Sequence, residues 1–389
     1  MKGYEFAGIH AGIKGNGKKD LGLIYSKKPA VAAALFTKNR VIAAPVIIGK
    51  EKIKSGLCQA VLVNSGNANC FTGQKGIENV KLCSKNISQR LGINDDLVFI
   101  SSTGVIGVNL PMDKFEVGIP EITQSLSQNH VDNFANAILT TDTHSKIVEH
   151  STKINETKFS IMGIAKGSGM IKPDMATMLA YICTDVKISA RDLKTALTIA
   201  NEKSFKRISI DGDTSTNDTL LALANNTSLV EIKSDESKKS FQNILDQVCL
   251  ELASMIVRDG EGATKFVKIT VKGAATKNDA FKACETIAQS NLVKTAIYGE
   301  DPNWGRITAA AGRSGADVDP EKMDLFFDEH ALVLKGRWLG AKAEQKCALI
   351  MKNSEIHITL DLNIGCESDY FLFCDFSKDY VKINAEYRS

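Results

Sequence analysis

The chain has 389 residues, 43% of them hydrophobic and 24% charged, so it is long enough for two domains with buried cores. The formal net charge is +3, without a long basic block, which leaves no electrostatic argument for nucleic acid or membrane binding. No stretch approaches the roughly 18 consecutive apolar residues of a membrane span, and glycines and charges interrupt the start before a signal-peptide core can form. We therefore expect a soluble, cytoplasmic protein.

Apolar runs of strand length alternate along the chain with longer helical patterns, which predicts a mixed α/β fold. In the first part we expect strands at 60–63, 97–100, 159–164 and 178–183, and helices at 76–91, 131–139, 190–206 and 236–257. In the second part we expect a helix at 279–289 and strands at 325–327, 332–334 and 356–362. The short polar stretch 273–278 is the best candidate boundary, so we expect a core of residues 1–275 and a C-terminal domain of residues 276–389.

Two segments imitate ligand-binding motifs but lack a required residue. In GIKGNGKK, residues 12–19, Lys19 stands where a phosphate-binding loop needs Ser or Thr. In DGDTSTND, residues 211–218, Thr216 stands where a calcium loop needs glycine. The cysteines form no CxxC pair, and the histidines show no metal-ligand spacing and no place in the central motifs. We expect neither a metal nor an organic cofactor.

The segment KGSGMIKPDMATMLAYICTD, residues 166–185, carries a threonine into an apolar run after glycines and Pro173. If the chain breaks between Ala176 and Thr177, the new α-amine, with a pKa of about 7.7–8.0, lies beside the hydroxyl. It can then take up the hydroxyl proton and activate Thr177 as a nucleophile. The alternative is an ordinary turn into a buried strand, because threonine is common in strands.

This segment resembles the cleavage signature of the glutamate N-acetyltransferase family, also called ornithine acetyltransferase, in which a precursor cuts itself before the threonine of ATML. Other motifs of the family occur in order along nearly the whole chain: AGIKGNGKKDLGLI, FTKNRVIAAPV, VNSGNANC, SSTGVIG, TTDT, DGDTSTND, RDGEGATKF, DPNWGRI and DYVKINAEYRS. The resemblance implies a four-layer α/β/β/α core, shared with self-cleaving amidases of the N-terminal-nucleophile type, and a smaller C-terminal α/β domain. It also implies fragments 1–176 and 177–389 that assemble as an α2β2 heterotetramer.

The resemblance assigns roles to residues that would otherwise be read as turn residues or surface charges. Thr177 is the implied nucleophile, and Thr103 and Gly104 form the oxyanion hole, where a hydroxyl and a glycine amide can donate to the same oxygen. The implied substrate contacts are Thr140 or Thr141, Lys166, Thr177, Glu261, Asn384 and Ser389. Glu261 would face the amino groups of ornithine. The chain departs from the family in ending in Ser389, where members commonly carry threonine.

The implied reaction belongs to arginine biosynthesis. An acetyl group passes from N2-acetylornithine to Thr177, ornithine leaves, and glutamate takes the acetyl group in a ping-pong sequence. Some members of the family also accept acetyl-CoA as donor, and no residue of this chain decides that point. Two alternatives stay open: a related self-cleaving hydrolase, an aminopeptidase or amidase in which water replaces glutamate, and a non-catalytic nucleotide-binding protein built on the glycine-rich loops.

Overall fold

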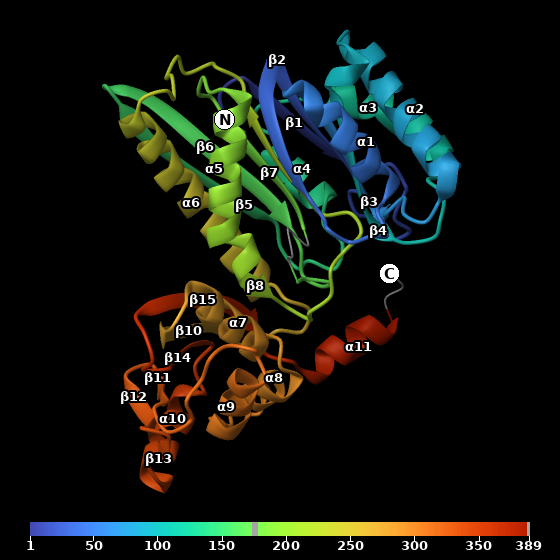
Figure 1. Ribbon diagram of the computed structural model, residues 1–389. Coiled ribbons are helices and arrows are strands. Elements are labelled where there is room, and N and C mark those ends of the chain that lie inside the picture. Colours follow the sequence, from blue (N-terminus) through green and yellow to red (C-terminus); the bar gives the residue numbers. More distant parts are fainter. Residues whose placement is uncertain (173–177, 387–389) are drawn as a thin grey trace. The chain divides into compact units, whose positions relative to one another are not determined.

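The computed structural model describes residues 1–172 and 178–386, which form two compact units (Figure 1). Among the described residues, the N-terminal unit comprises Met1–Lys206 and Asp213–Ile256, and the C-terminal unit comprises Arg207–Gly212 and residues 257–386. The second unit therefore begins before the boundary expected at 273–278. The reason is strand β10 (Phe266–Ala274), which ends at that boundary and belongs to the sheet of the C-terminal unit.

The described residues of the N-terminal unit contain one eight-stranded sheet, in the order β4-β3-β2-β9-β7-β6-β5 with β1 on β2. Its strands are β1 (Tyr4–Ile9), β2 (Leu21–Phe36), β3 (Leu57–Asn67), β4 (Val98–Val105), β5 (Lys146–Ile154), β6 (Thr157–Lys166), β7 (Leu179–Thr184) and β9 (Thr219–Ala224). Strand β2 pairs through its first half with β1 and β3 and through its second half with β9. Its register against β3 shifts between Tyr25 and Ala30, around Pro29, so β2 belongs to both halves of the sheet.

The two halves of this sheet face each other across a hydrophobic core. Tyr4 and Phe6 of β1 share that core with Tyr181 of β7, Leu221 of β9 and Phe134 of helix α4 (Val131–Ala137). Because successive side chains of a strand point to opposite faces, the neighbouring residues Ala7 and Ile9 enter a second core on the outer face.

Helices cover the two outer faces and complete four layers. Helices α2 and α3 lie on the outer core of the β1–β3–β4 half, while α5 and α6 cover the other half (Figure 1). The Phe241 ring of α6 lies 6.3 Å from that of Phe159 on β6. The helices of this unit are α1 (Ala44–Lys52), α2 (Gly73–Leu91), α3 (Met112–Gln124), α4 (Val131–Ala137), α5 (Ala190–Lys203) and α6 (Asp235–Arg258), with short 3-10 helices at Ile53–Ser55, Asp95–Leu97 and Phe205–Arg207. The expected mixed α/β class and four-layer core are confirmed.

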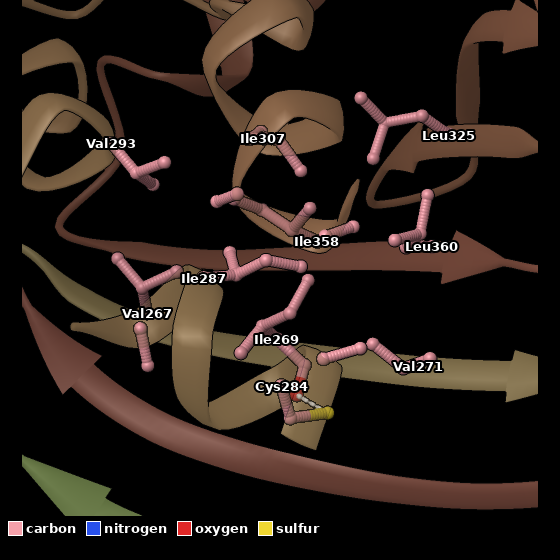
Figure 2. Packing of buried hydrophobic residues seen from close by; sticks show 14 of the residues in the cluster. Val267, Ile269, Val271, Cys284, Ile287, Val293, Ile307, Leu325, Ile358 and Leu360 are labelled. Atoms are coloured by element: carbon pink, nitrogen blue, oxygen red, sulfur yellow. Dashed lines mark hydrogen bonds between the residues drawn. The ribbon is translucent and has the colours of Figure 1, made fainter. Parts of the chain in front are cut away.

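The C-terminal unit has its own sheet and its own core. Its described residues form a seven-stranded sheet in the order β13-β12-β11-β14-β10-β15-β8. Side chains of β10 and β14, such as Val267, Ile269 and Ile358, pack against Ile287 of α7 (Figure 2). The further elements are β8 (Ile208–Ser209), α7 (Lys277–Ala288), α8 (Asn291–Tyr298), α9 (Trp304–Gly312), β11 (Asp324–Phe327), β12 (His330–Leu334), β13 (Arg337–Trp338), α10 (Ala341–Ile350), β14 (Glu355–Asp361), β15 (Glu367–Cys374) and α11 (Lys378–Glu386).

Candidate active site

Thr103 and Gly104 lie at the end of β4, as expected from the apolar run before them, and β4 extends beyond the strand predicted at 97–100. The register between β3 and β4 shifts at Gly66 and Asn67, so the two strands form a bulge opposite Thr103 and Gly104. Gly104 has φ +129°, and a Cβ at this position would lie 2.3 Å from the carbonyl carbon of Gly66. Only glycine fits there, since any side chain would meet the neighbouring backbone.

Three buried polar side chains hold this bulge. The Ser102 hydroxyl donates to Asn64 Oδ1 at 2.6 Å. The side-chain amide of Asn217 donates to the carbonyl oxygens of Ser102, at 2.8 Å, and Ala68, at 2.6 Å. Asn217 belongs to DGDTSTND, whose sequence indicated only a polar turn, and it fixes the backbone just before Thr103. Sequence reasoning missed this role because the partners lie more than 100 residues apart.

Lys166 and Thr140 meet at a buried carboxylate. The Lys166 ammonium donates to Thr140 Oγ1 at 2.7 Å and lies 3.6 Å from Asp142 Oδ2. Asp142 also accepts from Lys146 Nζ at 2.8 Å, from the Thr140 N–H at 3.0 Å and from the Gly167 N–H at 2.6 Å. Burial alone would raise the pKa of Asp142, but Lys166 and Lys146 outweigh it and hold that pKa well below its usual range.

The two threonines left undecided by the sequence have different partners. Thr140 accepts from Lys166, whereas the Thr141 hydroxyl shares a hydrogen bond of 2.7 Å with the Ser168 hydroxyl. Thr140 is therefore the one joined to Lys166. Asp142 contacts both the Thr140 and the Lys166 segments. The sequence did not single it out, because nothing in TTDT marks this aspartate as buried.

The strand register places the two ends of the expected cleavage segment side by side. Lys166, the last residue of β6, pairs with Leu179, the first residue of β7. Ala176 and Thr177 lie outside the described residues, as does Ser389. In the sequence, Thr177 precedes Leu179 by two residues. The residue paired with Lys166 is therefore only two positions from Thr177 along the chain.

Asp218 is a second buried carboxyl group next to this segment. It interacts with the backbone N–H of Met178, the residue that follows Thr177, and with the Ser215 hydroxyl. Its Oδ2 atom has no hydrogen-bond partner among the described residues. Burial raises the pKa of Asp218 well above its usual value of 3.8, against smaller opposing effects of Ser215 and Lys166, so the neutral form of this carboxyl group is favoured.

Glu261 and Asn384 meet within the C-terminal unit. Asn384 on α11 donates to Glu261 Oε2 at 2.7 Å. Gly262 has φ +67°, and a Cβ there would lie 2.5 Å from the backbone nitrogen of Tyr380. The loop that carries Glu261 therefore packs directly on the start of α11. The resemblance named both residues as substrate contacts. They lie 123 positions apart in the sequence and are hydrogen-bonded in the structure.

The sequence profile of the ArgJ family matches residues 5–389. The chain belongs to the ArgJ family. It is 45% identical to the arginine biosynthesis bifunctional protein ArgJ of Geobacter sulfurreducens, with 100% of both chains covered. It is also 45% identical to the glutamate N-acetyltransferase of Methanocaldococcus jannaschii, over 97% of this chain and 96% of that one. A crystal structure of ArgJ from Bacillus halodurans is similar to it, with 38% identity and a TM-score of 0.52, over 54% of this chain and 100% of that chain.

Membership of the ArgJ family identifies the chain as an enzyme and confirms the resemblance stated from its motifs. Among the described residues, no helix is both long enough and apolar enough to cross a membrane.

Proposed function

We propose that this protein transfers the acetyl group of N2-acetylornithine to glutamate through an acetyl ester on Thr177. The observation that carries the proposal is the pairing of Lys166 with Leu179. Leu179 follows Thr177 by two residues, and Lys166 is hydrogen-bonded to Thr140. Membership of the ArgJ family and a 45% identical relative named glutamate N-acetyltransferase support the same reaction.

The first step of the proposed mechanism is self-cleavage. The Thr177 hydroxyl attacks the carbonyl carbon of Ala176, the peptide C–N bond breaks, and the amide becomes an ester. Water then hydrolyses the ester, leaving a carboxylate on Ala176 and a free amine on Thr177.

Acetyl transfer uses the same hydroxyl twice. The Thr177 amine takes the hydroxyl proton, the oxygen attacks the acetyl carbonyl of N2-acetylornithine, and ornithine leaves with that proton on its α-nitrogen. The α-amine of glutamate then attacks the ester carbonyl, and the Thr177 oxygen recovers a proton as N-acetylglutamate forms. In this proposal, Thr103 and Gly104 donate to the carbonyl oxygen while it is negative, and Lys166, Thr140, Glu261, Asn384 and Ser389 bind the substrates.

The proposal predicts that Thr177→Ala yields one uncleaved chain without transferase activity, since both steps need this hydroxyl. Intact mass spectrometry measures cleavage, and acetylglutamate formation measures transfer. The control is Thr195→Ala, which removes an exposed threonine of α5 and should leave both unchanged. Two fragments from Thr177→Ala would contradict the mechanism.

The same assay separates the alternative reactions. Release of acetate from N2-acetylornithine at the same rate with and without glutamate would favour a hydrolase. Replacing N2-acetylornithine by acetyl-CoA tests the second donor, which the two 45% identical relatives do not decide because their names differ. We also propose that the two fragments assemble as an α2β2 heterotetramer.

A further inference from the structure

Lys14 lies in a loop between β1 and β2 that is fixed by a buried carboxylate. Asp20 accepts hydrogen bonds from the backbone N–H groups of Ala11, Ile13 and Lys14 at 2.6, 2.7 and 2.9 Å. These N–H groups, which a phosphate-binding loop would present to its ligand, are therefore already occupied. The same hydrogen bonds hold the backbone of Lys14 in place.

The Lys14 ammonium lies between the two segments that carry the candidate site. It donates to the carbonyl oxygens of Leu139 at 2.5 Å and of Lys19 at 3.1 Å. Leu139 directly precedes Thr140. On its other side, the Lys14 stem lies against Gly66, where a Cβ would be 2.9 Å from Lys14 Cγ, and Gly66 in turn faces Gly104.

The Lys14 ammonium is not in direct contact with a carboxylate. Asp142 forms ion pairs with Lys146 and Lys166, and Asp20 accepts hydrogen bonds from backbone N–H groups. No carboxylate of the described residues lies within 4 Å of Lys14 Nζ, and two of its three N–H donors are used by neutral carbonyls. The three ammonium groups of Lys14, Lys146 and Lys166 are accompanied by the carboxylates of Asp20 and Asp142, and burial shifts the third acid, Asp218, towards its neutral form.

Burial has a measurable consequence for this ammonium. It lowers the pKa of Lys14 to about 8, an effect that Asp20 and Asp142 oppose and that Lys166 and Lys18 strengthen. A ligand carboxylate at this point would gain an ion pair in a partly dehydrated environment, where such a pair is stronger than in water.

We propose that Lys14, acting with Lys166, binds the α-carboxylate of the amino-acid substrate. This inference rests on the proposed function. The nitrogen that exchanges the acetyl group is bonded to Cα, so the α-carboxylate is the charged group nearest to the reacting atoms in both the donor and the acceptor. The ammonium groups of Lys14 and Lys166, next to Leu139 and Thr140, can both donate to one carboxylate, and the same site serves both halves of the reaction.

The test compares ligands with and without that carboxylate. Calorimetry measures the Kd of L-ornithine and of 1,4-diaminobutane, its decarboxylated analogue, for the wild type, Lys14→Met and Lys14→Arg. Methionine keeps the stem against Gly66 without the charge, and arginine keeps the charge. The control is Lys18→Met, an exposed lysine of the same loop. We expect Lys14→Met to weaken ornithine binding at least about tenfold and the diamine less than about twofold, with Lys14→Arg retaining part of the preference.

Two outcomes would overturn the inference: an unchanged Kd for ornithine in Lys14→Met, or an equal loss for both ligands. Intact mass and thermal unfolding of the same samples identify a variant that fails to fold or to cleave, in which case Lys14→Arg decides the question. Absence of acetyl transfer in the wild type would instead contradict the proposed function. Transfer in the wild type with unaltered ornithine binding in Lys14→Met contradicts only the role of Lys14.

Discussion

Asp142 and Asp218 are both buried in the N-terminal unit, but different groups surround them. Asp142 faces two ammonium groups and two backbone N–H groups, so its charged form is favoured. Asp218 lacks such a cation within ion-pair distance among the described residues, and one of its oxygens has no partner. The pKa of Asp142 therefore falls and that of Asp218 rises, although the residue type is the same.

These opposite shifts predict opposite effects of the same substitution. Asp142→Asn removes the buried carboxylate that lies between the ammonium groups of Lys146 and Lys166, so we expect the free energy of unfolding at neutral pH to fall by about 3 kcal/mol or more. A lowered folded pKa stabilises the fold above the unfolded value of 3.8 and stops doing so as pH falls through the folded pKa. The deficit of Asp142→Asn should accordingly shrink below about pH 4.

Asp218→Asn should do the reverse. A raised folded pKa contributes stability that is complete below 3.8 and is lost as pH rises towards the folded value, because the unfolded chain then gains by ionising. The neutral asparagine avoids this loss, so the variant should equal the wild type near pH 3 and exceed it at pH 7. Urea unfolding of both variants across pH 3–8 checks the pair, and a loss of stability in Asp218→Asn at pH 7 would show that its carboxylate is ionised.

At the scale of elements, the end of β4 depends on close contact with β3. Gly104 has both a positive φ and the Gly66 backbone within 2.3 Å of the Cβ position, whereas Gly107, three residues on, has φ +84° and no atom within 4 Å. A side chain at Gly107 would therefore cost only the unfavourable φ angle, whereas one at Gly104 would also collide with the backbone of Gly66.

We expect Gly104→Ala to destabilise the fold by about 1–3 kcal/mol more than Gly107→Ala, because only the first forces β3 and β4 apart. We also expect Gly104→Ala to lose acetyl transfer, since the displaced amide is a proposed oxyanion donor, while Gly107→Ala keeps most of it. Thermal unfolding and acetylglutamate formation measure the two effects. Equal losses of stability and activity in both variants would indicate that the contact between Gly104 and Gly66 has no effect beyond that of the positive φ angle.

At the scale of the whole molecule, the sheet order determines how the proposed fragments hold together. Strands β1 to β6 belong to residues 1–176, and β7 and β9 belong to residues 177–389. The order β2-β9-β7-β6 inserts the two strands of the second fragment between strands of the first. Both edges of this insertion are hydrogen-bonded, and side chains of both fragments share one core.

We therefore predict that the cleaved fragments elute together in size-exclusion chromatography without denaturant and separate only once the protein is unfolded. Separation would expose the core and leave strand edges unpaired, which is strongly unfavourable. Reversed-phase chromatography with mass detection identifies the fragments, and the uncleaved Thr177→Ala chain serves as the control. Separate elution under native conditions would contradict a shared sheet.

Segments with strong local periodicity were predictable, and those stabilised by distant partners were not. The helix expected at 236–257 is observed as Asp235–Arg258, since its apolar spacing is itself the signal. Strand β2 escaped prediction because Ser26, Lys27, Lys28 and Pro29 interrupt its apolar pattern, and only pairing with β3 and β9 makes it continuous. Helix α3 contains Pro120, which on its own indicates a helix end.

The sequence by itself determined the fold class and the family, because periodicity and motif order are properties of residues near one another in the chain. Only the tertiary structure decided in which direction burial and charges shift the pKa values of Asp142 and Asp218, which threonine contacts Lys166, and where Lys14 lies. The contact of Lys14 with Leu139 joins residues 125 positions apart. Burial and Coulomb interactions act through space, so the protonation and charge of the site arise only when the chain has folded.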